Sequence, residues 1–416
     1  MKTSYTFFFI LPPLLLLNCS KFNEDLKGDF IKADEASISD FDTDFPVLNI
    51  SVNQEEFNNM YLNYNDGIEI EAFLNLYRNN ELLISDELIE LEIKGTESAT
   101  FELKSLGLKF DDTFENKNNV LINPDYVLSH HSIEKIKSFR LRNSGNDFKE
   151  TLLKDISYTQ LAINADLDLD LTYYEPAIVF INNSFSGIMN LRTEGNTNGI
   201  SRLNDVKKKA ITLAKINYPS EIEKKDGNFD RIDDFIEAIE NKNIQYLKEN
   251  VDINNFIDYI IFNTYISNVD WPYNNVRFYA VDDKPFRFIT YDLDWANTRK
   301  TDEHPLEFIK SPTKYSAKDA IKNPITDLFN ILYADTDFKN QFNNRYQSIV
   351  DSKVLSSNNF NNIVDKNYNA IKEYMPTHIS KHHDINTMIE WYRNIELLKE
   401  DFKKREENIE DLNPLF

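Results

Sequence analysis

The chain has 416 residues, of which 41% are hydrophobic and 13% aromatic, with only 9 glycines and 13 prolines. This composition excludes a fibrous or low-complexity protein and supplies a core for one large or two modest domains. The formal net charge of −23 disfavours passive binding to nucleic acid or an anionic membrane, so we expect no nucleic-acid partner. A few local cations and a metal ion could still hold one phosphate chain.

The N-terminus has the pattern of an export signal. Lys2 precedes the apolar run 7–17, which is too short to span a bilayer as a mature helix. The run ends in a Leu-Leu-Asn-Cys motif that resembles a bacterial lipobox, and its Cys19 is the only cysteine. We therefore predict a lipoprotein signal peptide over 1–18 and a membrane anchor at Cys19, which would become the lipidated first residue. The protein would then lie in the cell envelope, at the outer membrane, on its periplasmic or surface side. An ordinary secretion signal is the alternative.

The next two segments differ in character. Residues 19–44 are polar, acidic and aperiodic, which predicts a flexible, solvated tether. From residue 45 to about 125 the chain alternates apolar and polar residues, most clearly over 47–52, 67–77 and 89–94. Period-two alternation between Asn- and Gly-containing turns is typical of strands. We expect a β-rich N-terminal layer here.

Residues 126–416 mix both types of element before becoming largely helical, so the whole chain is predicted to have an α+β fold. The run 136–142 reads as a strand with Phe139 and Leu141 on one face and two arginines, Arg140 and Arg142, on the other. The remaining expected elements are a helix at 150–164, a hairpin at 177–192, helices at 230–241, 243–250 and 253–267, a second hairpin at 275–291, and helices from 325 to the end.

Two short segments carry the residues with the clearest chemistry. Asp270 precedes Asn275 by five residues, and an apolar strand then delivers Asp292 and Asp294. The spacing of five is that of a protein-kinase catalytic loop, in which the aspartate accepts the proton of the substrate hydroxyl and the asparagine binds metal. Carboxylate and carboxamide oxygens suit Mg²⁺. The structural alternative is that Asp270 caps a turn and that the later pair are turn residues after a strand.

Other polar residues have weaker patterns. The loop 94–98 contains glycine and hydroxyl residues and is followed by Lys104, which could contact phosphate, although an ordinary hairpin would look the same. Glu194 follows the hairpin and could be a metal ligand or a salt-bridge partner. Three histidines, His378, His382 and His383, lack an acidic residue at zinc-site spacing, and we interpret them as an exposed helix end.

Five blocks in the same order resemble the CotH (spore-coat protein H) kinase family, over about 45 to 410. The blocks are Gly95–Ser98 with Lys104, Phe139–Asp147, Val179–Glu194, Asp270–Asn275 and Tyr291–Asp294. The resemblance implies an atypical protein-kinase-like fold that binds ATP with Mg²⁺ or Mn²⁺ and phosphorylates serine or threonine of a protein substrate.

Carried over by position, the resemblance assigns individual roles. Asp270 would be the catalytic carboxylate, and Asn275 and Asp292 would be metal ligands, with Asp294 as a further one. Three residues would bind the nucleotide: Lys104, Arg142 and Glu194.

The sequence also departs from the family pattern. Thr96 stands where the family has asparagine, and Glu97 places a negative charge beside a supposed phosphate loop. Asn183 replaces the usual glycine in the hairpin turn, and Tyr291 stands where tryptophan is common. A catalytically inactive surface protein, structural or interacting, with a CotH-like fold therefore stays open as the alternative.

Overall fold

The computed structural model describes residues 30–128, 131–297, 304–310 and 323–412. The predicted signal peptide and lipidation site, residues 1–18 and Cys19, lie outside these ranges. Within them, every helix is too short or too polar to cross a bilayer.

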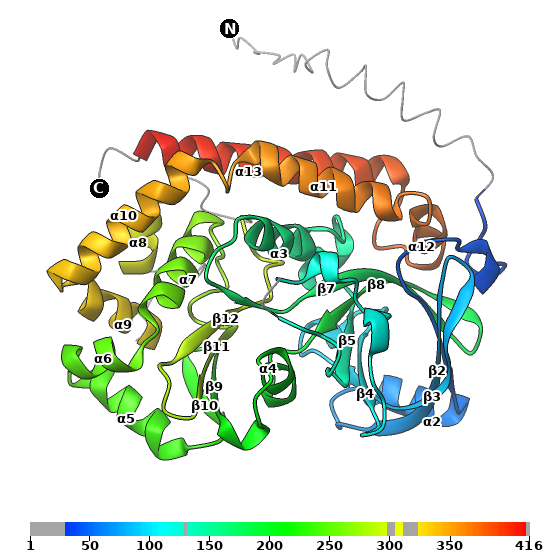
Figure 1. Cartoon of the computed structure of the whole chain (residues 1–416). Coiled ribbons are helices and arrows are strands. Elements are labelled where there is room, and N and C mark those ends of the chain that lie inside the picture. The colour runs from blue at the N-terminus through cyan, green and yellow to red at the C-terminus, as the bar shows by residue number, and fades with distance from the viewer. Residues whose placement is uncertain (1–29, 129–130, 298–303, 311–322, 413–416) are drawn as a thin grey trace, which may run out of the picture.

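The N-terminal half forms a closed barrel of seven strands in the order β1-β2-β3-β4-β5-β8-β7, closed by parallel pairing of β7 with β1. Alternate residues such as Ile50, Leu74 and Leu91 point inward and are fully buried. Figure 1 shows the barrel in blue, cyan and green. Its strands are β1 (Val47–Val52), β2 (Glu69–Arg78), β3 (Glu81–Lys94), β4 (Ser105–Phe110), β5 (Ser138–Arg142), β7 (Tyr174–Ile181) and β8 (Ser184–Thr193).

The barrel corrects the expected layer. We placed the β-rich part at 45–125, but β5, β7 and β8 come from 138–193 and share one hydrophobic core with the earlier strands. The proposed boundary at residue 125 therefore falls inside the barrel. The hairpin 177–192 is confirmed as β7 and β8, with Asn182 and Asn183 in the left-handed conformation that a tight two-residue turn requires.

A second sheet has the order β10-β9-β11-β12-β6 and is antiparallel except for the pair β12 and β6. One face, with Ala214 and Phe278, packs into the main core against helices. The other face carries a small separate cluster that includes Leu213 and Tyr279. The strands are β6 (Asp170–Leu171), β9 (Ile211–Asn217), β10 (Glu221–Asp226), β11 (Val276–Val281) and β12 (Arg287–Thr290).

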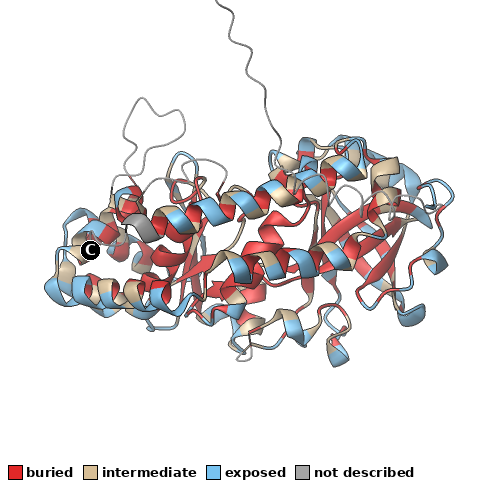
Figure 2. Ribbon diagram, turned by 90° about the horizontal axis from the view of Figure 1, so that it is seen from above, coloured by how far each residue is buried: buried red, intermediate tan, exposed pale blue. Residues whose placement is uncertain are grey.

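Helices cover the two sheets. In Figure 1, α11 and α13 run side by side above α3, and seen from above in Figure 2 they expose one face and bury the other. The helices are α2 (Gln54–Leu62), α3 (Lys154–Asn164), α4 (Thr197–Leu203), α5 (Phe229–Glu240), α6 (Ile244–Asn250), α7 (Ile253–Tyr265), α8 (Pro305–Lys310), α9 (Pro324–Tyr333), α10 (Thr336–Ser352), α11 (Ser357–Ile371), α12 (Met375–Lys381) and α13 (Met388–Leu412).

The segment that we predicted to be a solvated tether is partly folded. Phe41 is 2% exposed and packs against the rings of Phe180, Phe185 and Tyr374. The Ala33 amide donates to Ser380 Oγ at 3.0 Å. The stretch 30–44 is therefore part of the body, because its few apolar residues find partners on the barrel and the C-terminal helices.

The interpretation of the three histidines as an exposed helix end is also wrong for two of them. His378 and His382 are 2% and 4% exposed, whereas His383 is exposed. The Ile188 amide of β8 donates to His378 Nδ1 at 3.0 Å, and His382 Nε2 lies 2.6 Å from the Ser186 carbonyl. Strand β5 pairs with β8 only at residues 190–193, so the histidines satisfy backbone groups beyond the end of that ladder.

Candidate active site

A cleft opens where one end of the barrel faces the second sheet. It is lined by strands β5 and β8, helix α3, strand β11 and the loop that follows β12, and its cavity has a volume of about 40 Å³. Four of its residues are arginines, in a chain whose net charge is −23. The lining residues are Arg140, Arg142, Asp155, Thr172, Arg192, Thr193, Glu194, Gly195, Arg277, Tyr291 and Asp292.

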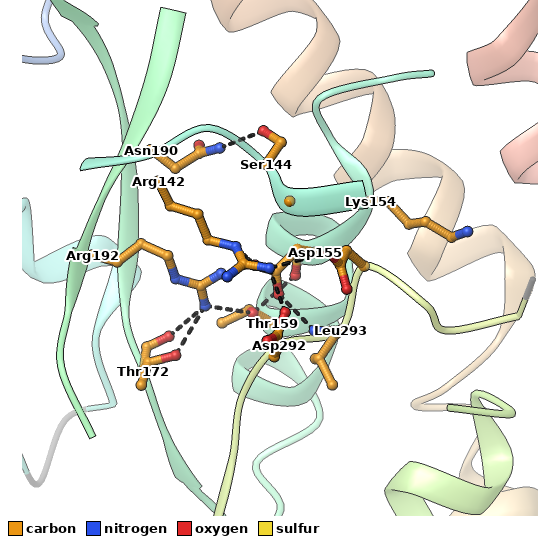
Figure 3. Close-up of polar contacts among 12 residues, drawn as sticks. Arg142, Ser144, Lys154, Asp155, Thr159, Thr172, Asn190, Arg192, Asp292 and Leu293 are labelled. Atoms are coloured by element: carbon orange, nitrogen blue, oxygen red, sulfur yellow. Dashed lines mark hydrogen bonds and ion pairs between the residues drawn. The ribbon is translucent and has the colours of Figure 1, made fainter. Parts of the chain in front are cut away.

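The predicted alternation along β5 explains why two of these arginines, Arg140 and Arg142, point away from the barrel core. Phe139 and Leu141 are fully buried in the barrel, so alternation directs Arg140 and Arg142 to the other face, as predicted. Arg142 Nη2 donates to Asp292 Oδ1 (Figure 3). The same nitrogen lies 3.2 Å from Asp294 Oδ2. Both aspartates of the later motif therefore meet the barrel through one guanidinium.

A second ion pair joins helix α3 to the barrel. Arg192 of β8 forms a salt bridge with Asp155 of α3, and both are buried, at 4% and 3% exposure. Arg192 Nη2 also donates to the Thr172 carbonyl at 2.9 Å. Asp155 Oδ1 accepts from the Leu293 amide at 3.0 Å. Asp155 thus connects the barrel arginines with the loop that carries Asp292, as Figure 3 shows.

The charges in this network shift the pKa values of Asp292 and Asp294 in opposite directions. Burial alone would raise the pKa of Asp292, but Arg142 and Arg140 outweigh it and lower that pKa. The pKa of Asp294 is raised well above its ordinary value, first by burial and then by repulsion from the charge of Asp292. Burial disfavours the charged form of Arg142 and by itself would lower its pKa. Attraction to the surrounding carboxylates is stronger and raises that pKa. Asp292 is therefore the ionised member of the pair.

The loop between α7 and β11 presents Asp270. Its Oδ2 accepts from Asn274 Nδ2 at 2.8 Å and from Asn275 Nδ2 at 2.6 Å, which fixes the plane of the carboxylate. Trp271 anchors the loop in the core, because it is 1% exposed and donates from Nε1 to Tyr259 Oη at 2.8 Å. Asn275 and Asp292 both adopt the left-handed conformation, with φ of 55° and 61°. Asparagine and aspartate tolerate this conformation better than other non-glycine residues.

The two motif segments lie side by side. The Asn297 amide donates to the carbonyls of Ile266 and Ser267 at 2.9 and 3.1 Å, and Asn268 forms an isolated bridge with Ala296. Burial raises the pKa of Tyr291 to about 12, with Arg277 opposing the rise and the charges of both Asp292 and Asp270 adding to it. The structure therefore brings the Asp270–Asn275 loop near the Asp292 loop, and of these three residues Asp292 alone is among those that line the cleft.

The nucleotide-binding residues that we predicted differ in position. Arg142 and Glu194 line the cleft, and Glu194 Oε1 lies 3.7 Å from Arg140 Nη2. Lys104 is not among the lining residues. Its Nζ donates to the carbonyls of Ala99 and Phe101 at 2.5 and 3.0 Å. The contact of Lys104 with phosphate stays a prediction, and it would require this ammonium to leave both carbonyls.

The negative charge of Glu97 lies outside the arginine-lined cleft. Glu97 is exposed and does not line the cleft, and its carbonyl accepts from Thr100 in the short turn that follows. It therefore does not oppose an anion in the arginine-lined cleft.

The residues at the loop end suit a hard divalent cation. Asp292 is ionised, Asp294 Oδ1 is buried without a hydrogen-bond partner, and the side chains of Asn275 and Asp270 supply further oxygens. Mg²⁺ is commonly bound by one or two carboxylates together with substrate phosphates. Across the described ranges, no group of three or more histidine, cysteine, aspartate or glutamate side chains is placed to hold a metal by itself. The fit is therefore to an ion that substrate oxygens help to bind.

Sequence reasoning missed Asp155, Arg192 and Arg277 as site residues. Arg277 is a single cation in an otherwise apolar strand, and that pattern could have signalled a polar site. Asp155 and Arg192 are 37 residues apart and offer no local signal, because their pairing depends on how α3 packs on the barrel.

A protein-family model described as CotH kinase protein matches residues 91–409. The match includes β4 to β12, both motif loops and most of the C-terminal helices. A comparison with curated proteins found no match.

Proposed function

The chain belongs to the CotH kinase family, and we propose on this basis that it transfers the γ-phosphoryl group of ATP to a serine or threonine hydroxyl of a protein. The observation that carries the proposal is the meeting of an arginine-lined cleft with the Asp270 and Asp292 loops. Phosphoryl transfer is catalysed mainly by positioning and by stabilising negative charge, and this cleft offers groups for both.

The nucleotide would lie along the cleft, whose cavity of about 40 Å³ would have to open to admit it. Beside the arginines lies a more apolar pocket that shares Glu194 and Gly195 with the cleft. Its apolar lining includes Leu203, Tyr279 and Ile289. We propose that the base enters this pocket, whose cavity of about 10 Å³ would open around it, and that the phosphates lie against the arginines. The local cations would attract the anion although the net charge of the chain repels it.

The ion pair between Arg192 and Asp155 has the form of the lysine–glutamate pair of protein kinases. In those enzymes, a strand lysine that contacts phosphates pairs with a glutamate of a neighbouring helix. Here a strand arginine pairs with a helix aspartate, and Asp155 also binds the Leu293 amide next to Asp292. The pair would hold Arg142 and Asp292 in register with the phosphates.

Asp292, Asn275 and Asp294 would hold the divalent cation. A bound Mg²⁺ or Mn²⁺ would neutralise charge on the β and γ phosphates. Asp270 would orient the acceptor hydroxyl and take its proton while the acceptor oxygen bonds to the γ-phosphorus and the bond to the β–γ bridging oxygen breaks. The hydrogen bonds from Asn274 and Asn275 keep the Asp270 carboxylate in one orientation for this step.

We also propose that the protein is anchored in the cell envelope through lipid on Cys19, at the outer membrane. The support is the lipobox-like motif at the end of a short apolar run. Metabolic labelling with a fatty-acid analogue tests the anchor. Wild type should carry the label, and the Cys19→Ala variant should not.

A second candidate is an inactive structural or interaction protein with this fold. One observation favours it, namely that Arg142 already neutralises the predicted metal ligand Asp292. Thermal unfolding with ATP and Mg²⁺ distinguishes the two, because a ligand that binds only the native state raises the melting temperature. The kinase proposal expects a rise with ATP and Mg²⁺ together. No shift at millimolar nucleotide would favour the inactive protein.

A further inference from the structure

Two basic residues of the second sheet stand side by side, and one of them, Arg277, lines the cleft. Lys215 of β9 and Arg277 of β11 are direct partners in the antiparallel register. They share the sheet face of Leu213 and Tyr279, which is opposite to the face that packs into the main core. The Arg277 guanidinium lies over the ring of Tyr291, 4.5 Å from its centroid, and lines the cleft.

Among the described residues, no carboxylate lies within ion-pair distance of Lys215 or Arg277. Neither side chain has a hydrogen-bond partner within the described ranges, and the carboxylate next to Lys215 in strand register, Glu223 of β10, is paired with Lys225. By contrast, each of the arginines at 140, 142 and 192 has an acidic partner within 4 Å. Half-burial lowers the pKa of Lys215 to about 8, repulsion from Arg277 and Lys225 adds to this effect, and the charges of Asp292 and Glu223 oppose it. Two neighbouring cations repel each other and add to the local positive potential.

The position of Arg277 in β11 connects the pair with both the predicted metal site and the apolar pocket. Along β11, Arg277 lies between Asn275, at the predicted metal site, and Tyr279, which lines the apolar pocket. The charge of Asp292 also acts on Lys215, although not enough to cancel the lowering of its pKa. An anion bound to the pair would therefore extend from the apolar pocket toward the aspartate loops.

We propose that Lys215 and Arg277 form a binding site for the phosphate chain of the nucleotide. This inference rests on the proposed function for the identity of the ligand, but the anion site itself does not depend on the transfer reaction. Arg277 would present two donors to neighbouring phosphate oxygens, and Lys215 would contact the same chain as a point charge. The second sheet, and not only the barrel, would then hold the substrate.

The test uses the full chain and three probes: inorganic tripolyphosphate without metal, ATP with Mg²⁺, and adenosine. Calorimetric titration compares wild type with Lys215→Met, Arg277→Met and the charge-preserving Lys215→Arg. Lys208→Met is the matched control, because Lys208 is an exposed lysine in the short turn before the same strand. Melting curves establish that each variant is folded.

We expect Lys215→Met and Arg277→Met each to weaken tripolyphosphate binding at least tenfold, with adenosine binding unchanged. Lys215→Arg and Lys208→Met should bind tripolyphosphate as wild type does. Affinity of wild type for tripolyphosphate should also fall as the pH rises above about 8, and this fall should be smaller in Lys215→Arg.

Two results would overturn the site. One is wild type that does not bind tripolyphosphate, and the other is Lys215→Met that binds it as tightly as wild type does. Wild type that binds tripolyphosphate but neither ATP nor adenosine would support the anion site and reject the nucleotide-dependent kinase. Failure of the proposed function and failure of this inference thus give different patterns.

Discussion

Arg142 of strand β5 donates to the carboxylate of Asp292, 150 residues later in the chain. The contact joins the barrel to the loop that follows the second sheet, and it places a guanidinium beside the predicted metal ligand. In this arrangement the protein itself supplies the positive charge that a cation would bring.

Replacing Arg142 with methionine should therefore destabilise the fold and create a response to Mg²⁺. Removal of one partner from a buried charge cluster costs about 3–5 kcal/mol, because Asp292, Asp155 and Asp294 lose their common counter-charge. Millimolar Mg²⁺ without nucleotide should recover part of this loss in the variant and should change wild type less. Melting temperatures with and without Mg²⁺ measure both effects. Arg393→Met, at an exposed position, is the control, and an equal Mg²⁺ response in Arg142→Met and wild type would contradict the account.

Gly145 is required by the same network. A Cβ atom at this position would lie 2.1 Å from Asp294 Oδ2 and 2.5 Å from Arg142 Nη2, and the residue has φ of +60°. Gly145→Ala should cost roughly 2–5 kcal/mol, from the left-handed backbone and the overlap together. Gly67→Ala is a matched control, because Gly67 has φ of +64° with no atom within 4 Å of the added Cβ. It should cost only about 1–2 kcal/mol. Equal losses in chemical denaturation would show that the contact with Asp294 is unimportant.

Stability should fall at mildly acidic pH because of His378 and His382. Burial lowers the pKa of both histidines, and the charge of His382 adds to the effect on His378. The nearest charged groups are Glu102, with Oε1 4.0 Å from His382 Nδ1, and Lys381 and Asp384. The unfolded chain then binds more protons than the folded one below pH 6.5. Stability is complete above that pH and is lost as the pH falls toward the lowered folded pKa values, by up to about 1.4 kcal/mol per pH unit for each histidine.

A comparison of variants isolates this effect. His378→Asn keeps a hydrogen-bond acceptor for the Ile188 amide but cannot be protonated, so it should lose less stability than wild type between pH 7 and 5. His383→Asn, at the exposed neighbour, should keep the wild-type slope. Free energies of unfolding from urea titrations at several pH values provide the measurement. A slope for His378→Asn as steep as that of wild type would argue against a buried, neutral His378.

Local sequence patterns predicted the elements whose burial is periodic. The β7–β8 hairpin, helices α5 to α7 and the opposite faces of Phe139 and Arg140 follow from alternation or helical spacing and are confirmed. Strands β9 and β10 were missed. Residues 221–226 of β10 are almost all charged, as is typical of an exposed edge strand, so no apolar alternation marks them.

The site could be predicted only where it is encoded in short motifs. The Asp270 and Asp292 loops are such motifs, and the structure brings them together. The pairings of Arg142 with Asp292 and of Lys215 with Arg277 depend on the closure of the barrel and on strand register. These are long-range properties, and the spacing of residues along the chain does not contain them.

Nucleotide binding and phosphate transfer, measured in parallel for Asp292→Ala and Asp270→Asn, test the central claim most directly. Calorimetry with ATP and Mg²⁺ gives the first quantity, and transfer of label from [γ-³²P]ATP to protein gives the second. Asp292→Ala should abolish Mg²⁺-dependent binding, because the ionised cation ligand is lost. Asp270→Asn should bind as wild type does and transfer no phosphate, because its side chain can no longer take the acceptor proton. Undiminished binding and transfer in both variants would contradict the assignment of these two carboxylates.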